Sequence, residues 1–333
     1  MPTPNAPDAA GSTLKPAQIA RFRADTLALT GTPPGKIGRA VSGGGDSLAM
    51  LLLAETAFPG QIEVATVDHG LRPAAADEAA FVAGFCAKRH IPHATLTVTV
   101  AEGQNVSDAA RQVRYGALLG WRELRNLAWV ATAHHADDQL ETMVMRLNRA
   151  SGLAGLAGIR AVNGYVIRPL LGWRQCELAA LVTAAGITPV VDPSNSDDRY
   201  DRARLRKLLA GSDLLDAEAV ARSAALLGEA EAALEAATDI LADGIDFGDG
   251  TAAFLPARLT SELQRRLILR CLAHVDPDNV ARGSAVARVV EALNDERPAS
   301  IGNALAQPDW LSHPDDGKMP LWRFVRAPAR RTA

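Results

Sequence analysis

The chain has 333 residues, of which 48% are hydrophobic, and it carries a formal net charge of -3. This length is sufficient for a substantial core and for two domains, whereas the slight acidity argues against nucleic-acid binding that depends on bulk charge. No apolar run approaches the roughly 20 residues of a membrane-spanning helix, so we expect no membrane anchoring. Cys86, Cys176 and Cys271 form no C-x-x-C pair and accompany no secretory signal, which predicts a cytoplasmic protein.

Residues 1–30 are expected to form a flexible N-terminal extension, because their first part is rich in Pro, Ala and Thr. Short β-rich segments and helical segments then alternate, which predicts an α/β fold over residues 31–215, with a doubly wound, mainly parallel sheet and helices on both faces. The expected strands are 36–41, 61–67, 94–100 and 128–133, and the expected helices are 47–57, 75–90, 105–125 and 136–149.

The sequence changes character after Lys207. Residues 216–243 are rich in Ala, Leu and Glu at helical spacing, and residues 259–274 and 285–293 also have helical patterns. We therefore expect a smaller, mostly helical domain over residues 216–326, followed by a loose tail over 327–333.

A glycine loop joins the first expected strand to the helix after it. Its small residues allow backbone N–H groups to converge on phosphate oxygens, and the helix N-terminus adds a positive dipole end. A carboxylate beside a bound phosphate is repelled unless it holds a cation such as Mg²⁺ or caps the helix, and for Asp46 we favour Mg²⁺. The alternative is a simple helix-entry turn with Asp or Ser as N-cap. The residues that would bind the phosphates are Ser42, Gly43, Gly44, Gly45, Asp46 and Ser47.

This loop lacks the lysine of a Walker A motif and the G-x-G-x-x-G spacing of dinucleotide-binding folds. It resembles the pyrophosphate-binding loop of the N-type ATP pyrophosphatases, also called PP-loop enzymes. That resemblance implies a substrate, ATP, from which pyrophosphate is released.

Two further motifs follow the second and fourth expected strands. Residues 68–72 read Asp-His-Gly-Leu-Arg, and residues 134–142 read His-His-Ala-Asp-Asp-Gln-Leu-Glu-Thr. Because ligands of such sheets bind beyond the carboxyl ends of the strands, we expect one pocket to collect both motifs and the glycine loop. Asp138 and Glu141 lie three residues apart and share a helical face. Such a pair could bind an ammonium group, hold a metal or move a proton, although acids here could also simply cap the helix.

Taken together and in order, four segments resemble those of the tRNA(Ile)-lysidine synthetase family, and the likeness spans about residues 36–210. The segments are 42–47, 67–72, 110–115 and 132–142. The resemblance implies ATP-dependent ligation of free L-lysine to C2 of the wobble cytidine of an isoleucine tRNA with a CAU anticodon. The reaction would pass through an O2-adenylated intermediate, release AMP and pyrophosphate, and change codon reading from AUG to AUA.

The resemblance also implies roles for individual residues. Asp46 would support Mg²⁺, Arg114 would stabilise phosphate charge, and His134 would donate a hydrogen bond during adenylation. Asp138 and Glu141 would recognise lysine, and one of them would remove a proton from its ammonium group.

RNA contacts are implied at two places. Arg202 and Arg206 would bind the RNA loop that carries the target cytidine, and the domain over 216–326 would contact the tRNA. Ala203 stands where the family tends to have an asparagine, so a role for that amide is in doubt. The oligomeric state is left open.

Three other functions compete with this one. A PP-loop tRNA thiolase would usually need cysteine chemistry. A metal-dependent phosphohydrolase would use His134, His135, Asp137 and Asp138 but leaves the glycine loop unexplained. A noncatalytic RNA-binding protein would not turn over ATP.

Overall fold

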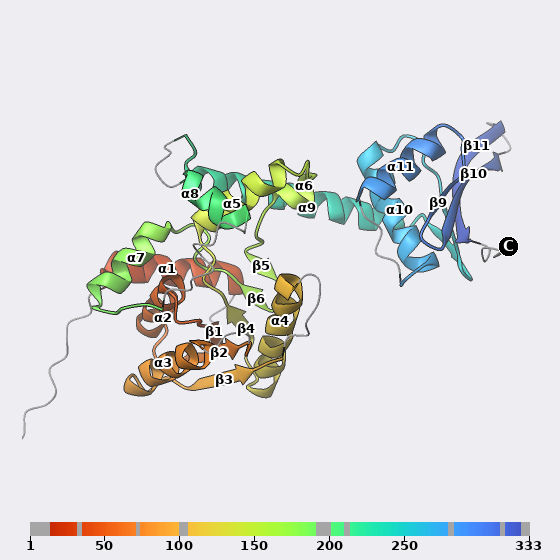
Figure 1. Cartoon of the computed structure of the whole chain (residues 1–333). Helices are drawn as coiled ribbons and strands as arrows, with labels where there is room; N and C mark the ends of the chain where they lie inside the picture. Colours follow the sequence, from red (N-terminus) through yellow and green to blue (C-terminus); the bar gives the residue numbers. More distant parts are fainter. Residues whose placement is uncertain are drawn as a thin grey trace, which may run out of the picture. The chain divides into compact units, whose positions relative to one another are not determined.

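The computed structural model describes residues 14–31, 35–70, 74–99, 106–190, 201–209, 214–278, 283–313 and 317–327. The chain divides into two compact units, Met1–Gly228 and Glu229–Ala333 (Figure 1). This division lies inside helix α9 (Ala217–Ala242), whereas the sequence places the domain boundary at residue 216. Residues 71 and 72 of the second motif and the tail from residue 328 lie outside the described residues. None of the helices in the described part of the chain has the length and apolar character that crossing a membrane requires.

The N-terminal unit contains a six-stranded sheet in the order β3-β2-β1-β4-β6-β5. Neighbouring strands are parallel except for β5 and β6, which are antiparallel. The mainly parallel sheet predicted from the sequence is therefore confirmed. Its strands are β1 (Ile37–Ala40), β2 (Ile62–Asp68), β3 (His93–Thr97), β4 (Trp129–Ala131), β5 (Val162–Asn163) and β6 (Val166–Ile167).

Four helices alternate with strands β1 to β4 where the sequence predicts them, and three shorter helices follow. The first four are α2 (Gly45–Ala57), α3 (Ala74–Lys88), α4 (Val106–Leu124) and α5 (Ala136–Leu147). The later three are α6 (Leu153–Leu156), α7 (Gln175–Ala184) and α8 (Asp201–Leu209).

Alternating side chains of the strands enter two separate cores, one on each face of the sheet. Ile37 and Val64 pack in the core formed with helices α1, α2, α3 and α7, whereas Ala40 and Ala65 pack against Leu118 and Trp121 of α4. Helices thus cover both faces, and the carboxyl ends of the strands are left as the place for a ligand.

Part of the predicted flexible extension is an ordered helix, α1 (Pro16–Thr30), so that prediction is wrong for residues 16–30. Pro16 occupies the first helical turn, and Gly31 ends the helix in the left-handed conformation with φ 73°. Phe22 is fully buried and meets Phe58 edge to face, with ring centroids 6.4 Å apart. Burial of this aromatic side chain attaches α1 to the first core. Residues 1–13 lie outside the described residues.

The C-terminal unit contains the helices predicted from the sequence, α10 (Ser261–Val275) and α11 (Gly283–Asn294), after the end of α9. It also contains an antiparallel sheet in the order β7-β8-β11-β10-β9, which the sequence analysis missed. Buried side chains of α10, α11 and the sheet form one core. The expected mostly helical domain is therefore a layer of helices on a sheet. Its strands are β7 (Asp246–Gly248), β8 (Thr251–Phe254), β9 (Ala299–Ile301), β10 (Ala304–His313) and β11 (Gly317–Arg326).

Two prolines explain why the long hairpin was missed, since proline argues against a central strand. Pro308 on β10 lies beyond residues 304–306, the only part of β10 that pairs with β9. Pro320 on β11 lies beyond residues 322–325, which pair with β8. Each proline therefore sits where its strand has one neighbour instead of two.

Arg39 on β1 is a charged residue inside the first core, and replacing it tests whether its burial destabilises the protein. Its side chain is completely buried, and none of its guanidinium nitrogens has a hydrogen-bond partner among the described residues. Burial lowers the pKa of Arg39 to about 9, because the charged form loses its hydration. Arg39→Met keeps an unbranched shape and removes the charge, so we expect the free energy of unfolding to rise by about 1–4 kcal/mol in urea denaturation. A less stable variant would show that the guanidinium has a compensating partner.

Candidate active site

The glycine loop leaves β1 and turns sharply at Gly43. This residue has φ 86°, a conformation that favours glycine. A Cβ atom at this position would lie 3.2 Å from Cγ2 of Val190, and the Val190 N–H donates to the Gly43 carbonyl over 3.0 Å. Gly43 therefore shapes the loop without facing a ligand itself.

The hydroxyl groups of the two loop serines, Ser42 and Ser47, make different contacts. Ser47 Oγ donates to the Gly44 carbonyl over 2.8 Å and accepts from the Ser42 N–H over 3.2 Å. Its hydroxyl therefore braces the loop. Ser42 Oγ lies 3.4 Å from Ser47 Oγ and keeps the freedom to turn its hydroxyl toward a bound anion.

Helix α2 begins directly after the loop, with Gly44 as N-cap and without a capping side chain. Its first intrahelical bond runs from the Leu48 N–H to the Gly44 carbonyl, so the N–H groups before residue 48 have no partner within the helix. Asp46 lies in this first turn but does not cap it. The alternative in which Asp or Ser is simply the N-cap is therefore wrong.

His135 connects the glycine loop to the second motif. It is the N-cap of α5: its Nδ1 accepts from the Asp138 N–H over 3.3 Å, and its own N–H donates to Asp138 Oδ2 over 3.1 Å. Its Nε2 lies 3.5 Å from a carboxylate oxygen of Asp46 and also 3.5 Å from a carboxylate oxygen of Asp138. Burial by itself lowers the pKa of His135, but the contact with Asp46 and the charge of Asp138 raise it above its usual value. The imidazole thus holds two carboxylates close together.

His134 has the opposite electrostatic environment. Burial, followed by the positive charges of Arg168, Arg114, Arg111 and Arg202, lowers the pKa of His134 to about 3. The imidazole is therefore neutral at physiological pH, with Nδ1 3.0 Å from Thr132 Oγ1. A neutral imidazole that accepts from the Thr132 hydroxyl carries its proton on Nε2, which can then donate to a reacting oxygen.

Arg114 is a candidate phosphate ligand on this basic side. Within the described part of the chain its guanidinium has neither an acidic partner nor a hydrogen-bond acceptor. Burial lowers the pKa of Arg114, so an anion beside it would restore the favourable environment of the charge.

Asp138 and Glu141 occupy different environments despite their shared helical face. Burial raises the pKa of Asp138, although His135 and Arg202 act against this effect. Glu141 is bound by Arg202 Nε at 2.8 Å and by Arg206 Nε at 2.7 Å, with its side chain 4% exposed. Asp138 therefore offers a carboxylate of raised basicity, whereas the carboxylate of Glu141 is already neutralised. Both arginines, expected to grip RNA, are engaged by Glu141 here.

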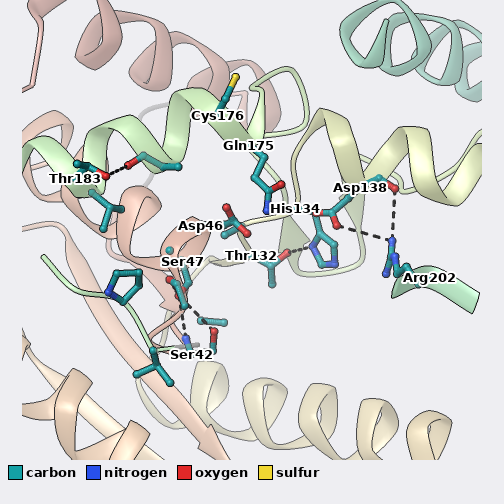
Figure 2. Close-up of a pocket in the computed structure, with 18 of the residues that line it drawn as sticks. Ser42, Asp46, Ser47, Thr132, His134, Asp138, Gln175, Cys176, Thr183 and Arg202 are labelled. Carbon is teal, nitrogen blue, oxygen red and sulfur yellow. Dashed lines mark hydrogen bonds and ion pairs between the residues drawn. The ribbon is translucent and has the colours of Figure 1, made fainter. Parts of the chain in front are cut away.

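Asp137 positions helix α7 beside the site. Its carboxylate accepts from the Gln175 N–H over 2.7 Å and from Arg174 Nη2 over 3.0 Å. Burial raises the pKa of Asp137, but these contacts outweigh it and lower the pKa below its usual value. The first turn of α7 is thereby fixed, and Figure 2 shows Gln175 pointing into the site beside Asp46.

These elements enclose a cavity of about 660 Å³ (Figure 2). Asp46 and Asp138 give it an acidic side, and Arg114 and His134 give it a basic or donor side. Gly43 and Glu141 are not among the described residues that line it. The predicted site residues that do line it are Ser42, Gly44, Gly45, Asp46, Ser47, Arg114, His134 and Asp138.

The expectation that three motifs share one pocket is met for two of them. Of the second motif, the described residues 68–70 do not line the cavity. Asp68 instead accepts from the Gly70 N–H over 2.9 Å, which is a local turn contact.

Several contributors were missed by the sequence analysis or given no role. Thr132 is a buried threonine directly after β4 that opens the family-like segment 132–142, where it was given no role. Gln175 reaches the cavity only because Asp137, 38 residues earlier, holds its backbone. His135 was predicted only as a metal ligand, although its position before Ala-Asp-Asp was a signal for an N-cap.

Mg²⁺ is usually held by one or two carboxylates together with substrate phosphates. Asp46 meets this requirement, because it lines the cavity in the first turn of α2 and its side chain is 36% exposed. The described residues contain no group of three or more His, Cys, Asp or Glu positioned to hold a metal. The donors therefore fit a cation that arrives with phosphates better than a permanent metal centre.

The low pKa of His134 predicts a pH-dependent stability. The unfolded chain takes up a proton on this histidine below about pH 6.5, whereas the folded protein does so only near pH 3. The contribution of the neutral imidazole is complete above pH 6.5 and is lost as the pH falls toward 3. Between pH 6 and 4, wild-type protein should lose up to about 1.4 kcal/mol per pH unit more than His134→Asn. Parallel unfolding curves for the two proteins over this interval would contradict the assigned pKa.

Known proteins are similar to this chain over the region that contains the site. Residues 17–212 match the family described as PP-loop domain. The tRNA(Ile)-lysidine synthase of Novosphingobium aromaticivorans is 44% identical over 94% of this chain and 94% of its own. That of Zymomonas mobilis is 40% identical over 90% of this chain and 91% of its own.

Among solved structures, the U34-tRNA thiolase NcsA from Methanococcus maripaludis has a similar fold, with a TM-score of 0.52 and 17% identity. The match covers 64% of this chain and 81% of the thiolase. The PP-loop match over residues 17–212 contains every residue that lines the cavity, and the relative from Novosphingobium aromaticivorans covers 94% of the chain and therefore extends into both compact units. The chain therefore belongs to the tRNA(Ile)-lysidine synthase family of PP-loop enzymes.

Proposed function

We propose that the protein ligates free L-lysine to C2 of the wobble cytidine in an isoleucine tRNA with a CAU anticodon, at the expense of ATP. The observation that carries the proposal is one cavity in which the glycine loop before α2, a neutral histidine and a carboxylate of raised pKa lie together. A two-substrate adenylation and ligation needs each of these features. The reaction would take place in the cytoplasm, where ATP, lysine and tRNA occur.

The first step would activate the cytidine. Its O2 attacks the α-phosphorus of ATP, an O–P bond forms, and the bond to pyrophosphate breaks. The N–H groups at the start of α2 and the Ser42 hydroxyl would bind the phosphates. Arg114 would stabilise the charge that develops on the α-phosphate of the transferred adenylyl group, and His134 would donate a hydrogen bond to that phosphate. Mg²⁺ held by Asp46 would offset the charge of the departing pyrophosphate.

The second step would form the new C–N bond. The ε-amine of lysine attacks C2, and the bond between C2 and the adenylated oxygen breaks as AMP leaves. Only the free amine is nucleophilic, so a base must first take a proton from the ammonium group. Asp138 is suited to this role because it lines the cavity and burial raises its pKa. Glu141 would assist by holding Arg202 in place.

The target base has to leave its stack in the anticodon loop to reach the cavity. The cavity volume of about 660 Å³ lies within the range of about 300–1,000 Å³ that is common for small-molecule sites. It must accommodate part of the ATP, the amino acid and the base at successive stages.

A single labelling assay tests the function. The protein is incubated with ATP, labelled lysine and transcripts of isoleucine and methionine tRNAs that both carry a CAU anticodon. Label should enter the isoleucine tRNA alone, with one AMP and one pyrophosphate released for each lysine incorporated. Turnover of ATP without incorporation of lysine into any tRNA would overturn the proposal.

The competing functions receive less support from the site. Two of the three cysteines, Cys86 and Cys271, are buried, and burial raises their pKa to about 11 and about 12. Cys176 lines the cavity, but Figure 2 shows its thiol directed away from Asp46 and His134. A phosphohydrolase would need His135 and Asp137 as metal ligands, but these two residues are engaged in fixing α5 and α7.

A further inference from the structure

A second cavity of about 380 Å³ lies within the C-terminal unit. It is bounded by the β10–β11 hairpin, the loop before α10 and the C-terminal end of α11. We propose that this cavity binds an unstacked nucleobase of the tRNA, with the indole of Trp310 as the stacking surface. The proposal rests on the proposed function, which supplies the RNA.

The cavity exists because the hairpin strands continue beyond the part of the sheet that α10 and α11 cover. On β10, Ala304 and Ala306 face α10 and α11 and are buried in the core. Trp310 lies on the same face, because side chains alternate along a strand, but it does not belong to that core and is 45% exposed. It pairs across the hairpin with Pro320, and both line the cavity. A large aromatic surface is thus presented to an open site.

Polar groups on the helices face this aromatic surface. Gln264 Nε2 donates to the Pro256 carbonyl over 3.4 Å, and Asn294 Nδ2 donates to Gln264 Oε1 over 3.3 Å. These two bonds fix the Asn294 amide, whose Oδ1 has no donor among the described residues. An oriented amide beside an aromatic ring is the combination that proteins use to read the edge of an unstacked base.

The carboxylate of Glu296 favours a base that carries an amino group. Asp309 is neutralised by Arg323 Nε at 2.8 Å, but Glu296 at the rim has no ion pair within the described part of the chain. A carboxylate here repels a phosphate and accepts a hydrogen bond from an exocyclic amino group. Arg258, also at the rim, can contact the sugar or stack on the base. The site therefore fits an amino-bearing base in single-stranded RNA.

Binding of tRNA to the full-length protein tests the proposal. Trp310→Ala should raise the Kd for tRNA about 5- to 100-fold, the range expected for loss of one aromatic–base stack. The KM values for ATP and lysine should not change. Trp310→Phe keeps a stacking ring and should stay within about threefold of wild type. A stacked base also quenches indole fluorescence, so tRNA should quench wild-type protein more strongly than Trp310→Phe.

Phe247→Ala is the matched control. Phe247 is an aromatic side chain of the same unit, 46% exposed, that does not line the cavity. Its removal should leave the affinity for tRNA at the wild-type value. An equal loss of affinity in Phe247→Ala and Trp310→Ala, together with lower melting temperatures, would reveal a structural effect and overturn the proposal.

The outcome for the pocket is separable from that for the enzyme. Lysidine formation by wild-type protein with unchanged tRNA affinity in Trp310→Ala would overturn the base pocket and leave the proposed function in place. Failure of wild-type protein to form lysidine, with selective loss of tRNA binding in Trp310→Ala, would overturn the function and retain an RNA-binding pocket.

Discussion

Asp46→Ala is expected to lower tRNA-dependent release of pyrophosphate from ATP by at least about 10³-fold, because the departing pyrophosphate loses its metal-mediated charge stabilisation. Asp46 lies in the first turn of α2, lines the cavity and lies 3.5 Å from Nε2 of His135. It caps no helix, so its removal should leave the melting temperature within a few degrees of wild type. Pyrophosphate release is measured with labelled ATP in the presence and absence of tRNA.

Asp77→Ala provides the matched control for this substitution. Asp77 is likewise an acidic residue in the first turn of a helix that covers the same sheet, but it is exposed and does not line the cavity. Its removal should leave pyrophosphate release unchanged. A wild-type rate in Asp46→Ala at saturating Mg²⁺ would show that the metal, if needed, is held elsewhere.

Asp138→Asn is expected to lower the rate of lysine transfer by about 10²–10⁴-fold, the usual contribution of a positioned general base. Adenylation of tRNA should survive, because the phosphate loop, Arg114 and His134 are unaltered. The asparagine carbonyl can still accept from the His135 N–H, so the cap of α5 is retained. Labelled adenylate should therefore accumulate on the tRNA, and a higher pH, which deprotonates free lysine, should partly restore transfer.

The substitution Glu141→Gln distinguishes the role of Glu141 from that of Asp138. Because Glu141 binds both Arg202, which lines the cavity, and Arg206, its loss should lower stability and impair both steps together. A selective rise in the KM for lysine, without loss of stability, would instead place Glu141 against the amino acid. If Asp138→Asn lowered the rates of adenylation and of lysine transfer equally, Asp138 would not be the general base.

The parallel sheet was predictable because its signals are local. Each β-rich segment is followed within a few residues by a helical pattern, and such units have one common way of packing. Helix α1 depends on a distant partner, since Phe22 is held by Phe58 and the first core. The C-terminal sheet depends on pairing across the chain, and the prolines at residues 308 and 320 conceal its longest hairpin.

The active site shows the same division between local and distant signals. The glycine loop and the His-His motif each lie on a continuous segment that ends a strand, so their meeting in one cavity followed from sheet topology. The different environments of Asp138 and Glu141 could not be predicted in this way. They depend on Arg202 and Arg206 of α8, which lie 60 or more residues later in the chain. The protonation states of His134 and His135 likewise depend on charges that several distant elements supply.

A crystal structure with Mg²⁺ and a non-hydrolysable ATP analogue would locate the nucleotide. The triphosphate should bind at the N–H groups that begin α2, beside Ser42, with Mg²⁺ on Asp46 and the α-phosphate between Arg114 and His134. A triphosphate bound away from residues 42–47, or with its α-phosphate out of reach of His134 and Asp138, would contradict this assignment of the site.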